Sequence, residues 1–565
     1  MPTIEVNYDD LQTLIGRHVP LDELRDKAIL YAKGEVEEID GEMLKLDIKD
    51  ANRPDLWSVE GIAREIAGRY GKPGLPDYKG KKPKLTVKID PKVKGVRPFT
   101  ACAVVKELNM DENTILQMIQ LQEKVSETFG KKRKDVAIGV YDLHKIKGPI
   151  RYTTVKPDGI KFTPLEFNKP LTPKQILEQH PKGKEYGHLL DGCTEYPIFI
   201  DAADEVLSMP PIINSNHTGK VTHETRDVFI ECSGFDMKRQ INALNVLVAA
   251  LADRGGIIES VKVIYPKTHG KTITTPDLSP NKTQITPGDI NKLMGLKLST
   301  KQIIDLLELA RYDAKQRGSK IEAVYPAYRQ DVMHWRDVAE DAIISYGYNN
   351  IKPLPPRLAT SGKEVDAEIF SRKIAEVMTG LGIQEVLSYI LTNKNDMFKR
   401  MNKREEAVVE IDNVVSANWS VFRAWLIPSL LDFLTRNKHN EYPQRIFEAG
   451  IAIIPDASQE TRTRDARKLA CALSNTIIGY EDISSILDAL LRLLGIKYAM
   501  RPKVHPSFIS GRSAAVLASG REIGIIGEIH PKVLNNWGIE KPVAAFELDL
   551  EGLKKIIESK NLKSK

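Results

Sequence analysis

Two hydrophobic periods alternate along the chain and predict a mixture of amphipathic helices and strands. Residues 111–128 carry Ile115, Met118 and Leu121 at helical spacing. Residues 445–454 instead form an almost continuous apolar run, which is typical of a central strand buried on both faces. Because both patterns recur from end to end, we predict an α+β protein with several domains. The predicted sections are 1–84, 85–272, 273–355 and 356–565, with a Lys/Pro/Gly-rich linker at 71–84.

The first section reads as a small α+β domain. Asp9 or Asp10 is expected to cap a short helix that Gly16 ends, and residues 21–33 are expected to form a second helix. A strand pair follows, and Ser58 is expected to cap the next helix.

The second section mixes strands and helices and contains a polar loop. Residues 207–219 and 227–236 look like a pair, the first a Pro-rich entry to the loop and the second an apolar strand. The loop residues Asn214, Asn216, Thr218 and His223 supply neutral donors and acceptors that could orient a water or an ester carbonyl. A hydrogen-bonded loop under a sheet is the alternative interpretation.

The last two sections each combine helices with a sheet. In 273–355, a capping box at Ser299–Gln302 opens an amphipathic helix, and a hairpin and a closing helix follow, which suggests a winged-helix-like domain. In 356–565, a helix at 365–379, a strand at 384–391 and several later apolar strands indicate a mostly antiparallel sheet.

Four carboxylates gather where the third section ends. On a helix beginning near His334, three of them fall at i, i+3 and i+4, and a fourth lies just upstream; the set is Asp331, Asp337, Glu340 and Asp341. Neighbouring like charges repel, so something must compensate them. A hard cation that takes oxygen ligands would do so, and so would Arg329, Arg336 and the positive helix N-terminus. The spacing alone leaves both readings open.

Composition narrows the functional classes only modestly. The 565 residues hold 82 Lys+Arg against 76 Asp+Glu, a net charge of +6 that permits a polyanionic partner without requiring one. The basic run at 131–134 is either a solvated loop or a phosphate contact. The four cysteines are far apart, which predicts neither a zinc site nor disulfides and fits a reducing, cytoplasmic setting. We also expect no membrane span and no signal peptide.

Common catalytic motifs are missing from the sequence. It contains no P-loop, dinucleotide fingerprint, H-E-x-x-H, kinase set or G-x-S-x-G. His530-Pro531 reads as a turn rather than a general base. None of these motifs therefore indicates a reaction class for this chain.

Three segments in this order carry a family resemblance: NRPDLWSVEGIARE at 52–65, PPIINS at 210–215, and DVMHWRDVAEDAIISYGYNNI at 331–351. Together they resemble the β subunits of phenylalanine–tRNA ligases of the archaeal and eukaryotic type, over essentially the whole chain. The resemblance implies an α2β2 heterotetramer that uses ATP to attach phenylalanine to tRNA(Phe), with ATP and phenylalanine bound by the α subunit.

The resemblance also assigns roles to the four sections. Residues 356–565 would be a class II synthetase-like domain without catalytic motifs, since Phe422-Arg423-Ala-Trp lacks the acid two residues after the arginine. Residues 85–272 would be a B3/B4-like editing domain that hydrolyses tyrosine wrongly attached to tRNA(Phe). Its candidate residues are Asn214, Asn216, Thr218, His223 and, as an acceptor for the tyrosine hydroxyl, Glu231.

In the family, an acidic set with this spacing is associated with Mg2+. It maps onto Asp331, Asp337, Glu340 and Asp341 of the B5-like domain at 273–355, where the ion would be structural. Two rival functions stay open at this point. One is a free-standing tRNA-binding or trans-editing protein, and the other is a metal-dependent enzyme centred on the four carboxylates.

Overall fold

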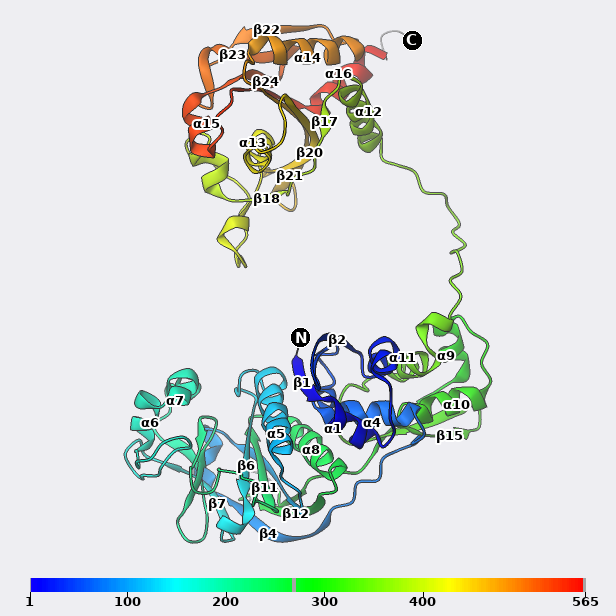
Figure 1. Cartoon of the computed structure of the whole chain (residues 1–565), viewed down its shortest axis with the longest axis vertical. Coiled ribbons are helices and arrows are strands. Elements are labelled where there is room, and N and C mark those ends of the chain that lie inside the picture. The colour runs from blue at the N-terminus through cyan, green and yellow to red at the C-terminus, as the bar shows by residue number, and fades with distance from the viewer. Residues whose placement is uncertain (1, 267–270, 562–565) are drawn as a thin grey trace. The chain divides into compact units, whose positions relative to one another are not determined.

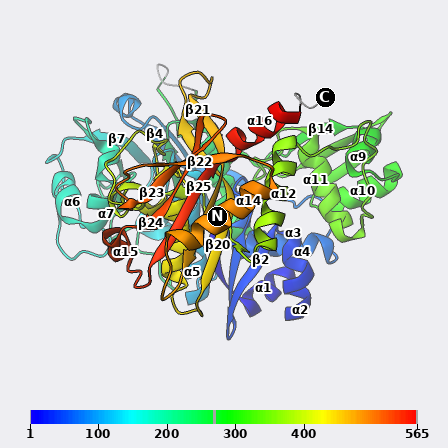
Figure 2. The ribbon, with the colours of Figure 1, turned by 90° about the horizontal axis from the view of Figure 1, so that it is seen from above.

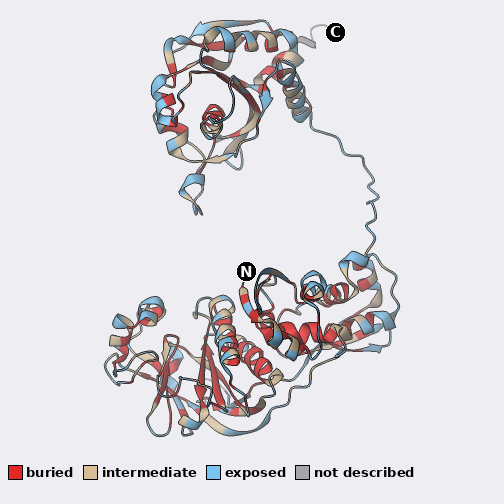
Figure 3. Ribbon diagram, viewed as in Figure 1, coloured by how far each residue is buried: buried red, intermediate tan, exposed pale blue. Residues whose placement is uncertain are grey.

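The computed structural model describes residues 2–266 and 271–561, which form two compact units, Met1–Leu354 and Pro355–Lys565. Figure 1 shows both. Residues 352–365 join them as an exposed segment without helix or strand, drawn in pale blue in Figure 3. The protein is thus a multidomain mixed α/β protein with several sheets.

The N-terminal part of the first unit is a three-stranded antiparallel sheet in the order β1-β3-β2, with helices on it. The cap of its first helix is Asn7, which accepts from the Asp10 N–H, and not Asp9 or Asp10, whereas Gly16 ends the helix at φ 76° as predicted. The predicted helix at 21–33 is interrupted by a π-helical turn, η1. The bounds are β1 Thr3–Asn7, α1 Tyr8–Ile15, α2 Leu21–Glu23, η1 Leu24–Ala28, α3 Ile29–Tyr31, β2 Gly34–Asp40, β3 Met43–Ile48 and α4 Val59–Arg69.

A ten-stranded sheet follows, in the order β10-β9-β8-β7-β4-β12-β5-β11-β6, with β13 paired to β12. It begins inside the predicted linker and continues past residue 272, so the predicted edges at 84 and 272 differ from those of the sheet. The strands are β4 Lys81–Ile89, β5 Phe99–Lys106, β6 Val136–Asp142, β7 Ile150–Val155, β8 Tyr196–Ile200, β9 Val206–Met209, β10 Ile213–Asn214, β11 Val228–Gly234, β12 Ile257–Ile264 and β13 Ile273–Thr275. The helices are α5 Glu112–Lys124, α6 Pro173–Gln179, α7 Pro181–Tyr186 and α8 Met237–Asp253.

The two segments expected to pair are not neighbouring strands. The segment at 207–219 supplies β9 and β10 at one end of the sheet, whereas β11 lies between β5 and β6 near the other end. The two ends nevertheless meet, because the Asp142 N–H at the end of β6 donates to the Thr218 carbonyl at 2.9 Å. This contact with the end of β6, the neighbour of β11, brings the polar loop near β11.

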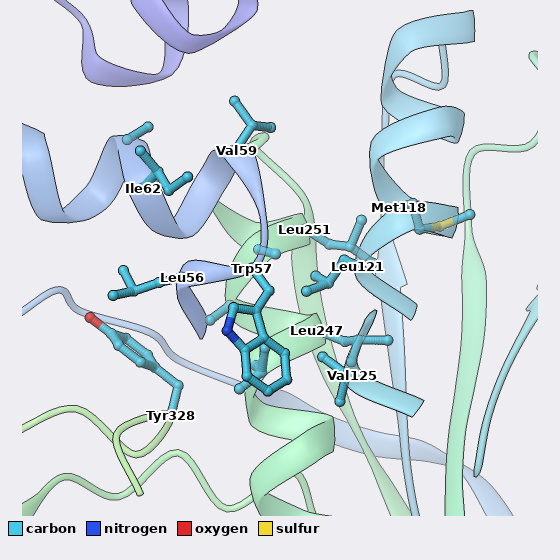
Figure 4. Close-up of a cluster of buried hydrophobic side chains, with 14 of the residues drawn as sticks. Leu56, Trp57, Val59, Ile62, Met118, Leu121, Val125, Leu247, Leu251 and Tyr328 are labelled. Carbon is cyan, nitrogen blue, oxygen red and sulfur yellow. The ribbon is translucent and has the colours of Figure 1, made fainter. Parts of the chain in front are cut away.

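Trp57 joins the N-terminal part to the large sheet. Its side chain is fully buried, and Figure 4 shows the indole between residues of α4, α5 and α8, including Leu121 and Leu247. Ser58 caps α4 as predicted by accepting from the Gly61 N–H. A Cβ on Gly61 would collide with the Asp55 carbonyl, so this position requires glycine. The segment at 52–65 therefore packs the N-terminal part of the first unit against the part that contains the large sheet.

The end of the first unit is a three-stranded antiparallel sheet, β14-β16-β15, with three helices beside it. Figures 1 and 2 show α9, α10 and α11 grouped together. The capping box at Ser299 and Gln302 is present. The bounds are β14 Asn281–Ile285, α9 Pro287–Met294, α10 Thr300–Leu309, β15 Asp313–Arg317, β16 Lys320–Tyr325 and α11 Trp335–Tyr346.

The second unit is built on a seven-stranded sheet in the order β17-β20-β21-β25-β24-β23-β22. Alternate residues of β21 enter two cores: Leu469 and Cys471 pack with α12 and α14, and Ala470 packs on the opposite face with α13 and α15. Its elements are α12 Asp366–Gly380, β17 Gln384–Glu385, β18 Leu391–Thr392, β19 Val421–Phe422, α13 Ile427–Arg436, β20 Gln444–Pro455, β21 Thr463–Ser474, α14 Tyr480–Leu493, β22 Tyr498–Pro502, β23 Phe508–Ala518, β24 Arg521–Ile529, α15 Pro531–Trp537, β25 Val543–Asp549 and α16 Leu550–Asn561.

Two strand predictions in this unit were wrong. The apolar run at 445–454 lies in β20, next to the two-residue edge strand β17, and its second half is mostly half-buried rather than covered on both faces. The strand expected at 384–391 is reduced to β17 and β18, which belong to different sheets. Apolar composition does not specify the position of a strand within a sheet, because that depends on partners distant in sequence.

Candidate functional site

A cavity of about 410 Å³ opens where the polar loop meets β6 and β11. Its walls come from α5, β6, β11 and the residues around Pro211, so segments more than a hundred residues apart share one space. This volume lies within the range of small-molecule sites. Lining residues that matter below are Arg133, Ser208, Asn214, Asn216 and Glu231.

Glu231 is the buried carboxylate of this cavity. It is 2% exposed, and Tyr141 Oη lies 3.2 Å from its Oε1 and 3.4 Å from Asn214 Oδ1. The Tyr141 ring lies along β6 over Gly139, where any Cβ would collide with the phenol. Tyr141 therefore links the acid on β11 to the amide on the loop.

The cavity leaves buried polar atoms without partners. Glu231 Oε2 and Ser208 Oγ are buried and form no hydrogen bond with any residue that the structure describes. Burial, opposed by the charge of Arg97, raises the pKa of Glu231 to about 7. An unsatisfied buried polar group costs about 1–3 kcal/mol, and a hydroxyl in the cavity could pair with these two atoms.

The loop residues predicted as site residues divide into three groups. Asn214 and Asn216 line the cavity. Thr218 is fully buried, and its Oγ lies 3.1 Å from Ser215 Oγ. It therefore stabilises the loop by a hydrogen bond within it and does not line the cavity. His223 is exposed and does not line it.

Two residues at this site escaped prediction. Tyr141 and Ser208 sit in apolar strand sequence, where nothing in the local pattern distinguishes them from core residues. Tyr141 lies beside Glu231 because β6 pairs with β11, whereas Ser208 reaches the cavity from β9, at the other end of the sheet.

The acidic cluster is compensated largely by arginine. The Arg329 guanidinium is buried and binds Asp331 through two bonds, at 2.8 and 2.6 Å, and Asp341 at 2.7 Å. These charges hold the pKa of Asp331 well below its usual range, against the opposing effect of burial. Arg53 Nε lies 3.8 Å from Asp331, so the segments at 52–65 and 331–351 meet in one buried network.

The other two predicted metal ligands face elsewhere. Asp337 caps α11 by accepting from the backbone N–H groups of Met333 and His334, and the exposed Glu340 pairs with Lys33 at 3.1 Å. Within residues 2–266 and 271–561, no three His, Cys, Asp or Glu side chains are arranged to hold a metal ion. In this arrangement the four carboxylates do not fit a Mg2+ centre, and the predicted site stays a prediction.

The second unit lacks an accessible arginine at the position considered for ATP. Arg423 is buried, pairs with Glu448 at 2.8 Å and donates to the Ile451 carbonyl. The guanidinium therefore binds groups of its own domain and is not exposed to a ligand.

Comparisons with known proteins match each part of the chain. The B3/4 domain model covers residues 108–247, the tRNA synthetase B5 domain model 283–348, and the phenylalanyl tRNA synthetase beta chain CLM domain model 351–550. The phenylalanine–tRNA ligase β subunit of Pyrococcus abyssi is 49% identical over 558 residues, which are 98% of this chain and 100% of that protein. This chain belongs to the phenylalanine–tRNA ligase β subunits.

A less similar member of the phenylalanine–tRNA ligase β subunits also matches over nearly the whole chain. The Korarchaeum cryptofilum protein is 39% identical over 98% of this chain and 99% of its own length. A crystal structure of an N-terminal fragment of the Pyrococcus horikoshii β subunit aligns with 61% of this chain and 100% of that fragment, at 46% identity and a TM-score of 0.59. Among the described residues, no helix is long and apolar enough to cross a membrane.

Proposed function

We propose that this chain is the non-ligating subunit of a cytoplasmic α2β2 phenylalanine–tRNA ligase and that its cavity hydrolyses tyrosine esters of tRNA(Phe). The unpartnered Glu231 Oε2 supports this proposal most directly, because a phenol hydroxyl would donate to it. Phenylalanine would leave Glu231 Oε2 and Ser208 Oγ without a partner, and sites built to bind a hydroxyl discriminate strongly against analogues that lack one.

The hydrolysis would rely on orientation rather than on a nucleophilic side chain. Asn214 and Asn216 line the cavity with amide groups that can hold a water and the ester carbonyl. Water would add to that carbonyl, and cleavage of the ester C–O bond would release tyrosine and tRNA with its hydroxyl restored. Mg2+ and ATP would act with the α subunit, where we place ligation.

The first test is mutation of the loop. In the complex with the α subunit, Asn216→Ala should slow Tyr-tRNA(Phe) hydrolysis about 100-fold, the scale of losing one oriented polar group. His223→Ala is the matched control, and it should leave the rate unchanged because its side chain lies outside the cavity. Rates are measured by release of labelled tyrosine. Equal effects of the two substitutions would refute the assignment.

An exposed apolar patch on the second unit favours a subunit over a free-standing trans-editing protein. Leu387 is 83% exposed and Tyr389 is 76% exposed, and the Tyr389 ring meets Trp419 edge-on at 5.3 Å. All three line a hollow of about 1030 Å³. Large exposed apolar and aromatic side chains inside an otherwise polar hollow mark an interaction site, so we assign the α subunit to it.

The second test concerns this partner. The chain alone should form no Phe-tRNA, and the mixture with α should form it. Leu387→Asp with Tyr389→Asp should abolish co-purification with α, because charges would be buried in the interface. Ile477→Asp, at another exposed apolar residue (86%), should not. Retention of α by the double variant, or ligation without α, would contradict the proposal.

A further inference from the structure

Arg97 is a buried cation without an acidic partner. Its side chain is 2% exposed, and its guanidinium donates to the carbonyls of Arg133, Lys134 and Ser233 and to the Ser233 hydroxyl. No carboxylate in the described part of the chain forms an ion pair with it. Burial accordingly lowers the pKa of Arg97. Glu231 and Asp135 act on this charge only from a distance, so the buried guanidinium adds positive potential at the nearest surface.

That surface is a second cavity of about 410 Å³, formed by the basic run at 131–134. Lys131, Lys132 and Arg133 adopt left-handed φ values of 49°, 52° and 64°, which turn the chain sharply and bring the lysines to the cavity. Lys131 pairs with Asp135 at 3.0 Å. Lys132 and Lys134 are exposed and form no ion pair with any described residue. The cavity therefore contains two exposed cations, Lys132 and Lys134, next to the buried Arg97.

An exposed aromatic ring completes this second cavity. Phe235 is 52% exposed and follows β11, and the Arg97 guanidinium lies 5.5 Å from its ring centroid. Cations that follow a phosphate backbone and an aromatic face on which a base stacks are the two parts of a single-stranded nucleic-acid site. An acidic protein segment would use the cations but would not need the ring.

The second cavity adjoins the first one through the same loop. Arg133 lines the first cavity and donates to the Ile212 carbonyl at 3.0 Å, while the lysines on either side of it line the second. Phe235 lies four residues after Glu231 on the same segment. A strand held at the second cavity would thus end close to the first.

We propose that this second cavity, bounded by Arg97, Lys131, Lys132, Lys134, His188 and Phe235, binds single-stranded RNA. Lys132 and Lys134 contact phosphates, and one base stacks on Phe235. The site holds the unpaired 3′ end of the RNA whose terminal ester enters the first cavity, and this part of the inference rests on the proposed editing function.

The test measures binding of a fluorescent six-nucleotide single-stranded RNA to the full chain by anisotropy, across a range of salt. Lys132→Ala with Lys134→Ala should weaken binding and reduce the slope of log K against log salt by about 1.4, at about 0.7 per phosphate contact. Phe235→Ala should weaken binding about tenfold. Matched controls are Lys88→Ala with Lys262→Ala, two exposed lysines on β4 and β12, and Leu116→Ala, an exposed apolar residue on α5. The controls should bind like the wild type.

Two results would overturn the inference. Unchanged binding in all these variants would show that RNA binds elsewhere. Weakening by the lysine variant alone, with tripolyphosphate displacing the RNA completely, would reveal a simple anion site. Neither result depends on ester hydrolysis. RNA binding that needs Phe235 in a protein inactive on Tyr-tRNA would instead refute only the editing function.

Discussion

Arg329→Met should destabilise the chain by about 3–5 kcal/mol, the usual cost of removing one partner from a buried ion pair. Arg329 binds both Asp331 and Asp341, which are buried, and its loss would leave two carboxylates facing each other. Arg53 lies 3.8 Å from Asp331 but cannot replace Arg329, because its guanidinium already binds Asp55 and Glu65. Urea unfolding of the full chain gives the change in free energy.

The control for this experiment is Arg336→Met, in the first turn of α11, the helix that carries Asp341. Arg336 is exposed and forms no ion pair among the described residues, so its substitution should cost less than about 0.5 kcal/mol. Titration with MgCl2 separates the two explanations for the acidic cluster. If arginine compensates the carboxylates, Mg2+ should not stabilise the wild type. A small effect of Arg329→Met together with selective stabilisation by Mg2+ would establish a metal site there instead.

Glu231 should make the protein less stable as the pH rises from about 5 to about 8. Its pKa is about 7 in the folded chain, above the ordinary value of 4.5, so the folded state holds a proton that the unfolded state has lost. Stability is therefore fully present below the unfolded pKa and falls until the folded pKa is passed. A shift of this size corresponds to about 3 kcal/mol.

Glu231→Gln should remove this loss of stability because the amide cannot ionise. The variant should exceed the wild type in stability at pH 8 and approach it at pH 5, as measured by urea midpoints at each pH. Glu224→Gln, at an exposed carboxylate near the loop, should reproduce the pH dependence of the wild type. Parallel curves for Glu231→Gln and the wild type would show that Glu231 does not titrate in this range. A gain in stability at pH 8 would show that the ionised Glu231 carboxylate destabilises the folded chain.

Local sequence was sufficient for several features of the fold. The Ser58 cap, the capping box at Ser299 and the Gly16 helix end are confirmed, because each depends on atoms within a few residues. The apolar run in β20 was correctly predicted as a strand and misplaced within its sheet. Strand order depends on pairing between distant segments, which periodicity does not encode.

The candidate site likewise combines residues that the sequence predicted with residues that only the fold brings together. Asn214, Asn216 and Glu231 were predicted from their chemistry and the family resemblance, and they line one cavity. Tyr141 and Ser208 were not predicted, because neither local pattern nor spacing indicates that β6 pairs with β11 or that the segment after β10 contacts the end of β6.

The segment at 331–351 shows which features the sequence determines and which depend on the tertiary structure. The sequence by itself determined the acidic spacing, the helix and the family, since these are local or are carried by the motif. Only the tertiary structure decided that Arg329 and Arg53 reach the buried carboxylates, while Asp337 caps the helix and Glu340 faces Lys33. The reason is that charge compensation depends on distance in space, and Arg53 arrives there from a segment nearly three hundred residues away.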